Sequence, residues 1–465
     1  MTERAGVRAR RAGRPSAAAY RSPKGTPMFV RRSFAVIAAA SALCAVTAPA
    51  ASPAAAAGAG AGARASTASA GKLPDGLYGK ADPKYDGVWR QSVALLAQDA
   101  AGAKPAAKAV EWLAEQQCDD GSFTAYRADP GAGCDAKKTP ADTNATALAV
   151  QALSAVGGRS ATVRESLAWL GSVQNKDGGW GYNPGSPTDA NSVSVVMGAY
   201  SAAGREPERI RKGGASPYDA LETLQLGCDA EASGRGAYAY QPGKKGELAA
   251  NDDATAAATL AGFGSGLLVG DGGRNGAADG ESRKSRPVEP LKCGDGDGKQ
   301  PGGRTEAAEA GAAYLASVLK KGGGHLRAVT PGAEGGPDYA NTADAVIALA
   351  AGGHRAEAEK SLDWLAGELG KWDKSRNDPA AIGGVMLAVH ATGGDAAKLG
   401  GVGLLKRLNA TGPQPARVPE ENGGGDEDGQ EGSSSVATWS LVGAGLAAGA
   451  GVGFLLSGRR KRQGL

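Results

Sequence analysis

A repeated frame of aromatic, leucine, glutamine and glycine residues is the feature that most constrains the fold of this 465-residue chain. The frame reads aromatic-Leu-x3-Gln-x3-Gly-x-aromatic and occurs in full twice, at Trp112–Phe123 and Trp169–Trp180, 57 residues apart. Weaker copies begin at Leu221, Tyr314 and Trp364. Repeats of this length are typical of stacked helical hairpins, so the chain is expected to be a helical repeat protein.

A second kind of segment alternates with these copies and carries almost no charge. Such segments begin at Asp142, Asp189, Asn251, Tyr339 and Asn377. An uncharged helix is covered on all sides, whereas the helices of the repeated frame carry charges on one side and face water. Adding an opening helix at 88–97 and a closing helix at 396–408 gives twelve helices. The pattern predicts an all-α fold, an (α/α)6 toroid with an apolar inner ring and an amphipathic outer ring.

The Gln-x3-Gly-x-Trp part of the frame resembles the QW repeat of the prenyltransferase and squalene cyclase superfamily. The resemblance covers most of residues 72–412, with two copies that match fully. It implies the toroid of the terpenoid cyclases and protein prenyltransferases, a fold shared with the cobalamin carriers of the transcobalamin type. In that superfamily the glutamine and tryptophan join an outer helix to its neighbour, so the resemblance implies a fold more than a chemistry.

Composition and charge agree with helices and exclude some partners. Only 5% of the residues are aromatic while 74 are glycine, which disfavours a β-sandwich or barrel. The net charge is +4, but nine Lys or Arg and one Glu lie in residues 1–32 and four basic residues lie at 459–462, so the remaining chain carries −8. An acidic body argues against nucleic acid as a partner.

The two ends of the chain predict export and anchoring. Residues 1–50 form a leader with a basic pair, an apolar stretch and small residues at a cleavage site, and translation starts at Met1 or Met28. Residues 436–457 are uncharged and long enough to cross a bilayer. The basic tail at 458–465 then stays in the cytoplasm, which places the domain outside the cell membrane on a single-pass anchor. Gly445, Gly449 and Gly453 lie four apart, a spacing that also allows dimerisation of the span.

The region between leader and anchor divides by composition. Residues 51–71 are an Ala/Gly-rich spacer and residues 413–435 an acidic Gly/Ser linker. Residues 72–412 are expected to form the toroid, interrupted by a low-complexity insertion at 264–304.

Four cysteines remain after the leader is removed, which predicts two disulfides in an exported protein. Cys118 and Cys134 bracket one loop and are expected to pair with each other. Cys228 and Cys293 are then left to pair across the insertion.

The resemblance implies two kinds of catalysis that the residues of the domain can be compared with. The protein prenyltransferases use zinc, but the histidines His325, His354 and His390 have no cysteine in a matching context, so no metal or other cofactor is predicted. Squalene cyclases protonate an alkene with clustered aspartates, and Asp252 and Asp253 are the alternative catalytic residues here. The position of Asn251 and Asp253 just before an apolar helix favours helix capping instead.

The starts of the apolar helices are expected to surround one mouth of the toroid and bind a ligand there. The candidate ligand-binding residues are the polar and aromatic side chains at these starts and in the loops before them: Asp142, Asn144, Asp189, Asn191, Asn251, Asp253, Asn341, Asn377, Trp180, Tyr182 and Tyr238. We expect a non-catalytic surface protein that binds a bulky small molecule, for which a corrinoid is the first candidate because of the cobalamin carriers. The alternatives are a cyclase-like enzyme and a structural or partner-binding surface protein.

Overall fold

The computed structural model describes residues 73–270, 284–294, 301–329 and 334–419. The predicted leader, spacer, membrane span with its three spaced glycines, and basic tail lie outside the described residues. Within the described part of the chain, no helix has both the length and the apolarity needed to cross a membrane.

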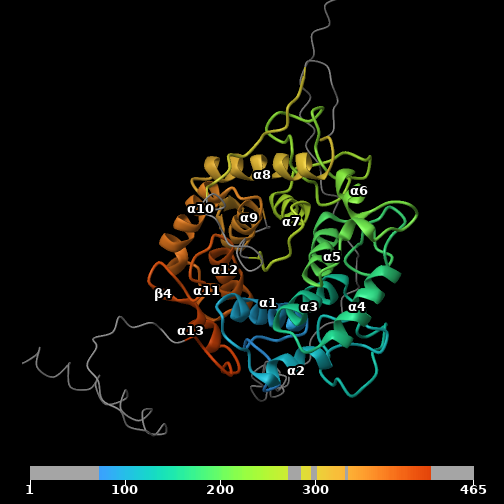
Figure 1. The fold of residues 1–465 in the computed structure, drawn as a ribbon, viewed down its shortest axis with the longest axis vertical. Coiled ribbons are helices and arrows are strands. Elements are labelled where there is room, and N and C mark those ends of the chain that lie inside the picture. Colours follow the sequence, from blue (N-terminus) through green and yellow to red (C-terminus); the bar gives the residue numbers. More distant parts are fainter. Residues whose placement is uncertain (1–72, 271–283, 295–300, 330–333, 420–465) are drawn as a thin grey trace, which may run out of the picture. The chain divides into compact units, whose positions relative to one another are not determined.

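Six helices form a closed ring in which each packs against the next, and the last packs against the first (Figure 1). In order round the ring they are α1 (Gly87–Ala100), α3 (Thr143–Val156), α5 (Ala190–Ala202), α7 (Asp252–Gly262), α9 (Tyr339–Ala351) and α12 (Pro379–Ala391). These are the uncharged segments of the sequence, so the prediction of buried apolar helices is confirmed, and the described residues are mostly helical with two short two-stranded sheets.

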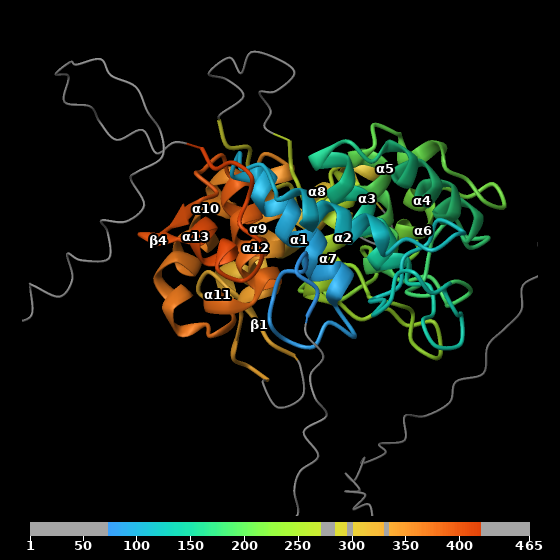
Figure 2. The same ribbon diagram turned by 90° about the horizontal axis from the view of Figure 1, so that it is seen from below.

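Shorter or more polar helices lie outside this ring, one after each inner helix (Figure 1). They are α2 (Ala107–Glu115), α4 (Ser160–Ser172), α6 (Pro217–Glu222), α8 (Arg304–Lys321), α10 (Arg355–Glu368) and α13 (Leu404–Asn409). A further short helix, α11 (Lys374–Asn377), lies between α10 and α12 and was not predicted. Figure 2 shows the ring edge-on, with α11 and the short strand β1 (Leu326–Arg327) on the same side of it.

The glutamine of the repeated frame joins neighbouring outer segments, as the resemblance implied. Gln117 Nε2 donates hydrogen bonds to Thr162 O and Ser166 Oγ of α4 at 3.0 and 2.9 Å. Gln225 Nε2 does the same two repeats later, to Ala307 O of α8 at 2.8 Å. Gln117 is half-buried and Gln225 is fully buried, so each bond satisfies polar atoms that would otherwise be costly to remove from water.

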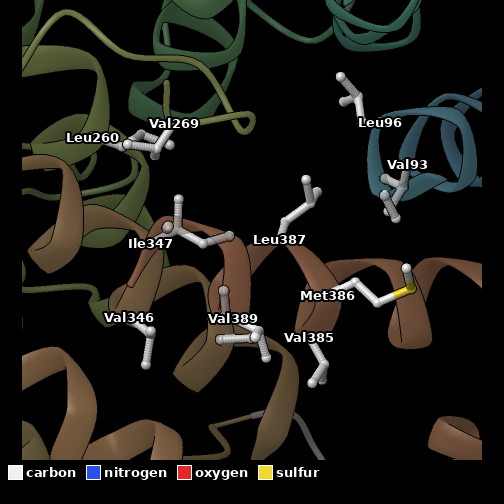
Figure 3. Close-up of a cluster of buried hydrophobic side chains, with 14 of the residues drawn as sticks. Val93, Leu96, Leu260, Val269, Val346, Ile347, Val385, Met386, Leu387 and Val389 are labelled. Carbon is white, nitrogen blue, oxygen red and sulfur yellow. The ribbon is translucent and has the colours of Figure 1, made fainter. Parts of the chain in front are cut away.

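The apolar core is shared by the inner helices. Val346 and Ile347 of α9 lie in one cluster with Val385 and Met386 of α12 and with Val93 of α1 (Figure 3). All five side chains are buried. Burial of this kind accounts for most of the stability of helices whose own propensity is modest.

The start of the predicted insertion closes the ring at one end. Residues 265–267 line the central cavity, and Leu267 N donates a 2.9 Å hydrogen bond to Gln151 Oε1 of α3. Val269 packs beside Leu260 of α7 (Figure 3). A second part of the insertion is held on the outside, where Arg286 forms a 2.6 Å ion pair with Glu309 of α8.

Both predicted disulfides are confirmed. Cys118 is bonded to Cys134, and Cys228 is bonded to Cys293, with Cα–Cα distances of 5.7 and 5.5 Å. The second bond joins the loop after α6 to the insertion.

The ends of the domain differ from the predictions in detail. The closing helix expected at 396–408 begins only at Leu404, because residues 398–403 form a hairpin of β3 (Lys398–Leu399) and β4 (Val402–Gly403). A similar short pairing joins β1 to β2 (Pro337–Asp338) just before α9. The first residues of the predicted acidic linker also pack on the domain, since Lys104 and Arg417 pair as an isolated β-bridge.

Candidate functional site

A cavity of about 600 Å³ lies inside the ring. One end is closed by residues 265–267, and the lining there is apolar, with Leu260, Ile347 and Leu387. The other end is surrounded by the first turns of the inner helices. This end is polar, because each inner helix starts with a polar capping residue or with a polar residue in its first turn.

The predicted polar residues fall into two sets that alternate along the chain. Asp142, Asp189 and Asn251 are helix caps, and each accepts a hydrogen bond from the backbone amide three residues later. They do not line the cavity. The residues two positions further on, Asn144, Asn191 and Asp253, do line it. Since two residues turn a helix by roughly 200°, a cap and the second helical residue point to different sides.

Asp253 is therefore not a helix cap, and that part of the prediction was wrong. Asn251 takes the capping position of α7, so Asp253 is free to point inward. Its Oδ2 accepts a 2.6 Å hydrogen bond from Asn191 Nδ2 of the neighbouring helix α5. Burial raises the pKa of the Asp253 carboxyl, and the Asn191 hydrogen bond partly opposes the increase.

The caps of the last two inner helices also differ from the prediction. Asp338, not Asn341, caps α9, and Asp378, not Asn377, caps α12. Proline at the first position of α12 lacks an amide hydrogen and favours a helix start there, which makes the preceding aspartate the cap. Asn341 still lines the cavity and donates a 2.8 Å hydrogen bond to Asp338 Oδ2.

Asp344 lines the cavity and was missed by the sequence reasoning. It lies on α9, one turn deeper than Ala340 and on the same face. No described residue forms a hydrogen bond with its carboxyl group. Burial, with the nearby charges of Asp253 and Asp338, raises its pKa to about 7. The signal in the sequence was a single charge inside the otherwise apolar stretch 342–351.

The two aspartates proposed as an alternative catalytic pair are separated. Asp252 does not line the cavity, and its Oδ1 accepts a 2.7 Å hydrogen bond from Tyr314 OH of the outer helix α8. Consecutive residues of a helix point about 100° apart, so Asp252 points away from the cavity that Asp253 lines. The carboxyl group that accompanies Asp253 in the cavity is Asp344.

Three aromatic side chains line the polar end of the cavity, and none of them was predicted. They are Trp89 of α1, Tyr339 of α9 and Trp372 before α11. Tyr339 and Trp372 stack with ring centroids 5.2 Å apart and planes at 8°. The stacked rings of Tyr339 and Trp372 are suited to contact the apolar or cationic part of a ligand.

The aromatic residues that were predicted to bind the ligand lie outside the cavity. Trp180 is fully buried and its Nε1 donates a 2.8 Å hydrogen bond to Leu170 O. Tyr238 is also buried, and Tyr182 is exposed in the loop before α5. None of the three lines the cavity.

Asparagine and aspartate side chains supply several hydrogen-bond acceptors among the lining residues. Asn144 Oδ1 and Asn191 Oδ1 are buried and have no hydrogen-bond partner among the described residues. The charged lining consists of four aspartates and one lysine: Asp253, Asp338, Asp344, Asp378 and Lys374. Within the described part of the chain, no three acidic, His or Cys side chains are arranged to hold a metal ion.

Fold and site together define an all-helical ring domain with an acidic central cavity. No protein-family model matches the chain, and no curated protein matches it. Among solved structures, a protein from Actinoplanes is similar at 16% identity and a TM-score of 0.30, over 65% of this chain and 99% of that one. A sugar epimerase from a ruminal bacterium is similar at 14% identity and a TM-score of 0.38, over 62% of this chain and 79% of that one. The interpretation of the cavity therefore depends on its own residues.

Proposed function

We propose that residues 72–412 form an (α/α)6 toroid that binds a small organic cation in its central cavity. The leader and the span at 436–457 place this domain outside the cell membrane in the proposal. The ring of six inner helices, with one outer helix after each, supports the toroid. The observation that carries the choice of ligand is the excess of carboxylates over cations in the cavity.

The charges of the cavity favour a positively charged ligand. Four aspartates and one lysine leave the lining negative, and the apolar closed end lowers the local dielectric constant. Burial, and after it the charges of Asp253 and Asp338, raise the pKa of the Asp344 carboxyl. A ligand cation in the cavity relieves this repulsion between the carboxylates.

The aromatic lining adds a second attraction for the same class of ligand. A cation over the face of tryptophan or tyrosine gains about 0.5–2 kcal/mol, depending on how far it is removed from water. Trp89, Tyr339 and Trp372 lie at the same end of the cavity as the aspartates. An amine or quaternary ammonium group on an apolar body therefore fits both the charges and the rings.

The volume of the cavity bears on the corrinoid that the sequence suggested. Cavities of roughly 300–1,000 Å³ enclose drug-sized ligands, and the volume of about 600 Å³ lies inside that range. A corrinoid, with its macrocycle and nucleotide loop, is considerably larger. The corrinoid stays an untested prediction, and we place a compact amine before it.

A binding titration tests the proposal directly. Trp89 and Trp372 line the cavity, so their fluorescence should change on titration with spermidine or choline and not with neutral glucose. Asp344→Asn and Asp253→Asn should each weaken amine binding at least tenfold. Asp363→Asn makes the same change of charge on the exposed side of α10 and should leave binding unchanged. Binding that is equal in all four proteins, or no binding of any amine, contradicts the proposal.

A second candidate function is proton transfer to the ligand, as in a cyclase-like enzyme. The observation that favours it is Asp344, a carboxyl group with a pKa of about 7 that faces the cavity and Asp253. A protonated Asp344 can give its proton to an alkene carbon, whose π electrons form the new C–H bond and leave Asp344 as a carboxylate. The Asp253 carboxylate can stabilise the resulting carbocation, which ends as an alkene when a neighbouring carbon loses its proton to a carboxylate of the cavity. The test is incubation with squalene and product analysis. Conversion that Asp344→Asn abolishes and Asp363→Asn preserves supports an enzyme, and an unchanged substrate leaves the binding function. A purely structural or partner-binding role follows if neither ligand nor product is found.

A further inference from the structure

A second pocket, of about 460 Å³, adjoins the central cavity and is basic where the cavity is acidic. It is lined by residues from 79–90, 374–379 and 410–411, which are far apart in the sequence. Lys374 and Asp378 belong to the lining of both spaces. The other charged residues of this basic pocket are Lys80, Asp86, Arg90 and Arg376.

The two carboxylates of the basic pocket are already engaged. Asp378 caps α12 and accepts hydrogen bonds from Ala380 N and Ala381 N at 3.0 and 3.2 Å. Asp86 Oδ1 lies 3.3 Å from Arg90 Nη1. Neither aspartate forms an ion pair with Lys80 or Lys374, and these two ammonium groups form none with any other described residue.

Arg90 gives the pocket a fixed cation. Its side chain is only 2% exposed, and Nη2 donates a 2.8 Å hydrogen bond to Ala81 O. Its Nε is buried and has no hydrogen-bond partner in the described residues. A guanidinium held in this way loses little conformational freedom when an anion binds.

The other cations of the pocket are more exposed than Arg90. Arg376 Nη2 donates a 2.9 Å hydrogen bond to Gly370 O, and Nε is 3.9 Å from Asp373 Oδ1, a separation at which an ion pair contributes little in water. Lys374 precedes α12, whose N-terminus adds a partial positive charge. Four cations against two carboxylates leave the pocket with a net charge of about +2, which matches a phosphate dianion.

We propose that the basic pocket binds a phosphate group, and that the ligand of the domain is dipolar. The phosphate lies between Lys80, Arg90 and Arg376, while an amine at the other end of the ligand reaches the aspartates of the cavity past Lys374 and Asp378. The class of ligand is an amino or ammonium alcohol esterified with phosphate. The amine half of this inference rests on the proposed function, and the phosphate half does not.

Inorganic phosphate tests the basic pocket by itself. Calorimetry on the detergent-solubilised full-length chain should show saturable binding at one site. Lys80→Ala and Arg376→Ala should each weaken it at least fivefold, whereas Lys360→Ala, on the exposed side of α10, should have no effect. Absence of saturable binding, or equal binding in the three variants, overturns the phosphate site.

Phosphoethanolamine tests the dipolar ligand. It should bind at least tenfold more tightly than inorganic phosphate, and Asp253→Asn should remove that gain without changing phosphate binding. Equal affinities for the two probes overturn the dipolar ligand and leave the phosphate site standing, while the titration with spermidine or choline decides separately whether the cation site exists. Phosphatidylethanolamine vesicles carry the same group, and co-sedimentation separates a lipid headgroup from a free ester.

Discussion

Asn191 Nδ2 of α5 donates a 2.6 Å hydrogen bond to Asp253 Oδ2 of α7. Both residues occupy the second position of their helices and both line the cavity. The bond leaves Asn191 Oδ1 without a partner among the described residues. The bond therefore fixes the direction of the Asp253 carboxylate and joins the first turns of two neighbouring inner helices.

Helix capping and cavity lining can be separated by mutation at α7. Asn251→Ala removes the acceptor for Ala254 N, which lies at 2.8 Å, and should lower the free energy of unfolding by about 0.5–2 kcal/mol. Asp253→Asn should have a much smaller effect, because its side chain does not cap the helix. Denaturant unfolding of the two variants measures the difference. A larger loss for Asp253→Asn than for Asn251→Ala would contradict these roles.

The fold could be predicted from the sequence because its signals are local and repeated. Alternation of charged and uncharged helices follows from which side meets water, and the glutamine of the frame forms hydrogen bonds to the neighbouring segment, as expected. The third copy of the frame looked degenerate because a disulfide-bonded loop separates Gln225 from Gly236. In the structure Gln225 pairs with Tyr238 as Gln117 pairs with Phe123.

The cavity lining was harder to predict, since it depends on direction rather than on sequence position. Asp142 and Asn144 are two residues apart and both polar, yet one caps the helix and the other faces the cavity. The rings were chosen from loops that lead into the helices, whereas Trp89 lies within the first turn of α1 and Trp372 lies before a helix that was not predicted. Asp344 is a single charge in an apolar helix. Its place in the cavity becomes visible only when the six inner helices are arranged in a ring, and this arrangement is not contained in the local sequence.

The titration of Asp344 should appear in the stability of the protein. Its folded pKa of about 7 lies above the unfolded value of roughly 3.9, so folding takes up a proton between these values. The contribution of this group to stability is therefore most favourable at low pH and is lost as the pH rises toward 7. Asp344→Asn should raise the Tm relative to the wild type at pH 8 and change it little at pH 4.

A matched variant controls for the loss of one negative charge. Asp363→Asn lies on the exposed side of α10, and the difference between its Tm and that of the wild type should not depend on pH. If the Asp344→Asn difference is also constant from pH 4 to 8, the carboxyl group is ionised throughout, and both the general-acid function and its coupling to Asp253 are excluded.

The predicted topology places the domain outside the membrane on a single C-terminal span. Protease added to intact cells should remove the domain and leave a short membrane-bound fragment that contains the basic tail at 458–465. An antibody to the tail should detect that fragment only after the membrane is opened. A domain that stays intact until lysis would show that the orientation is inverted.

Gly121 provides a test of how the repeated frame holds the outer helices. It has φ +89°, and a Cβ there would collide with the backbone carbonyl of Glu165 in α4. Gly158 has a similar φ of +75° but open space around it, and Gly133 has neither restriction.

Gly133→Ala should therefore be nearly neutral, and Gly158→Ala should cost about 1 kcal/mol of stability through backbone strain alone. Gly121→Ala should cost clearly more, because the strain is joined by a clash that only movement of α4 can relieve. Equal losses at Gly121 and Gly158, measured by thermal unfolding, would show that close approach of the two segments is not what requires glycine in the frame.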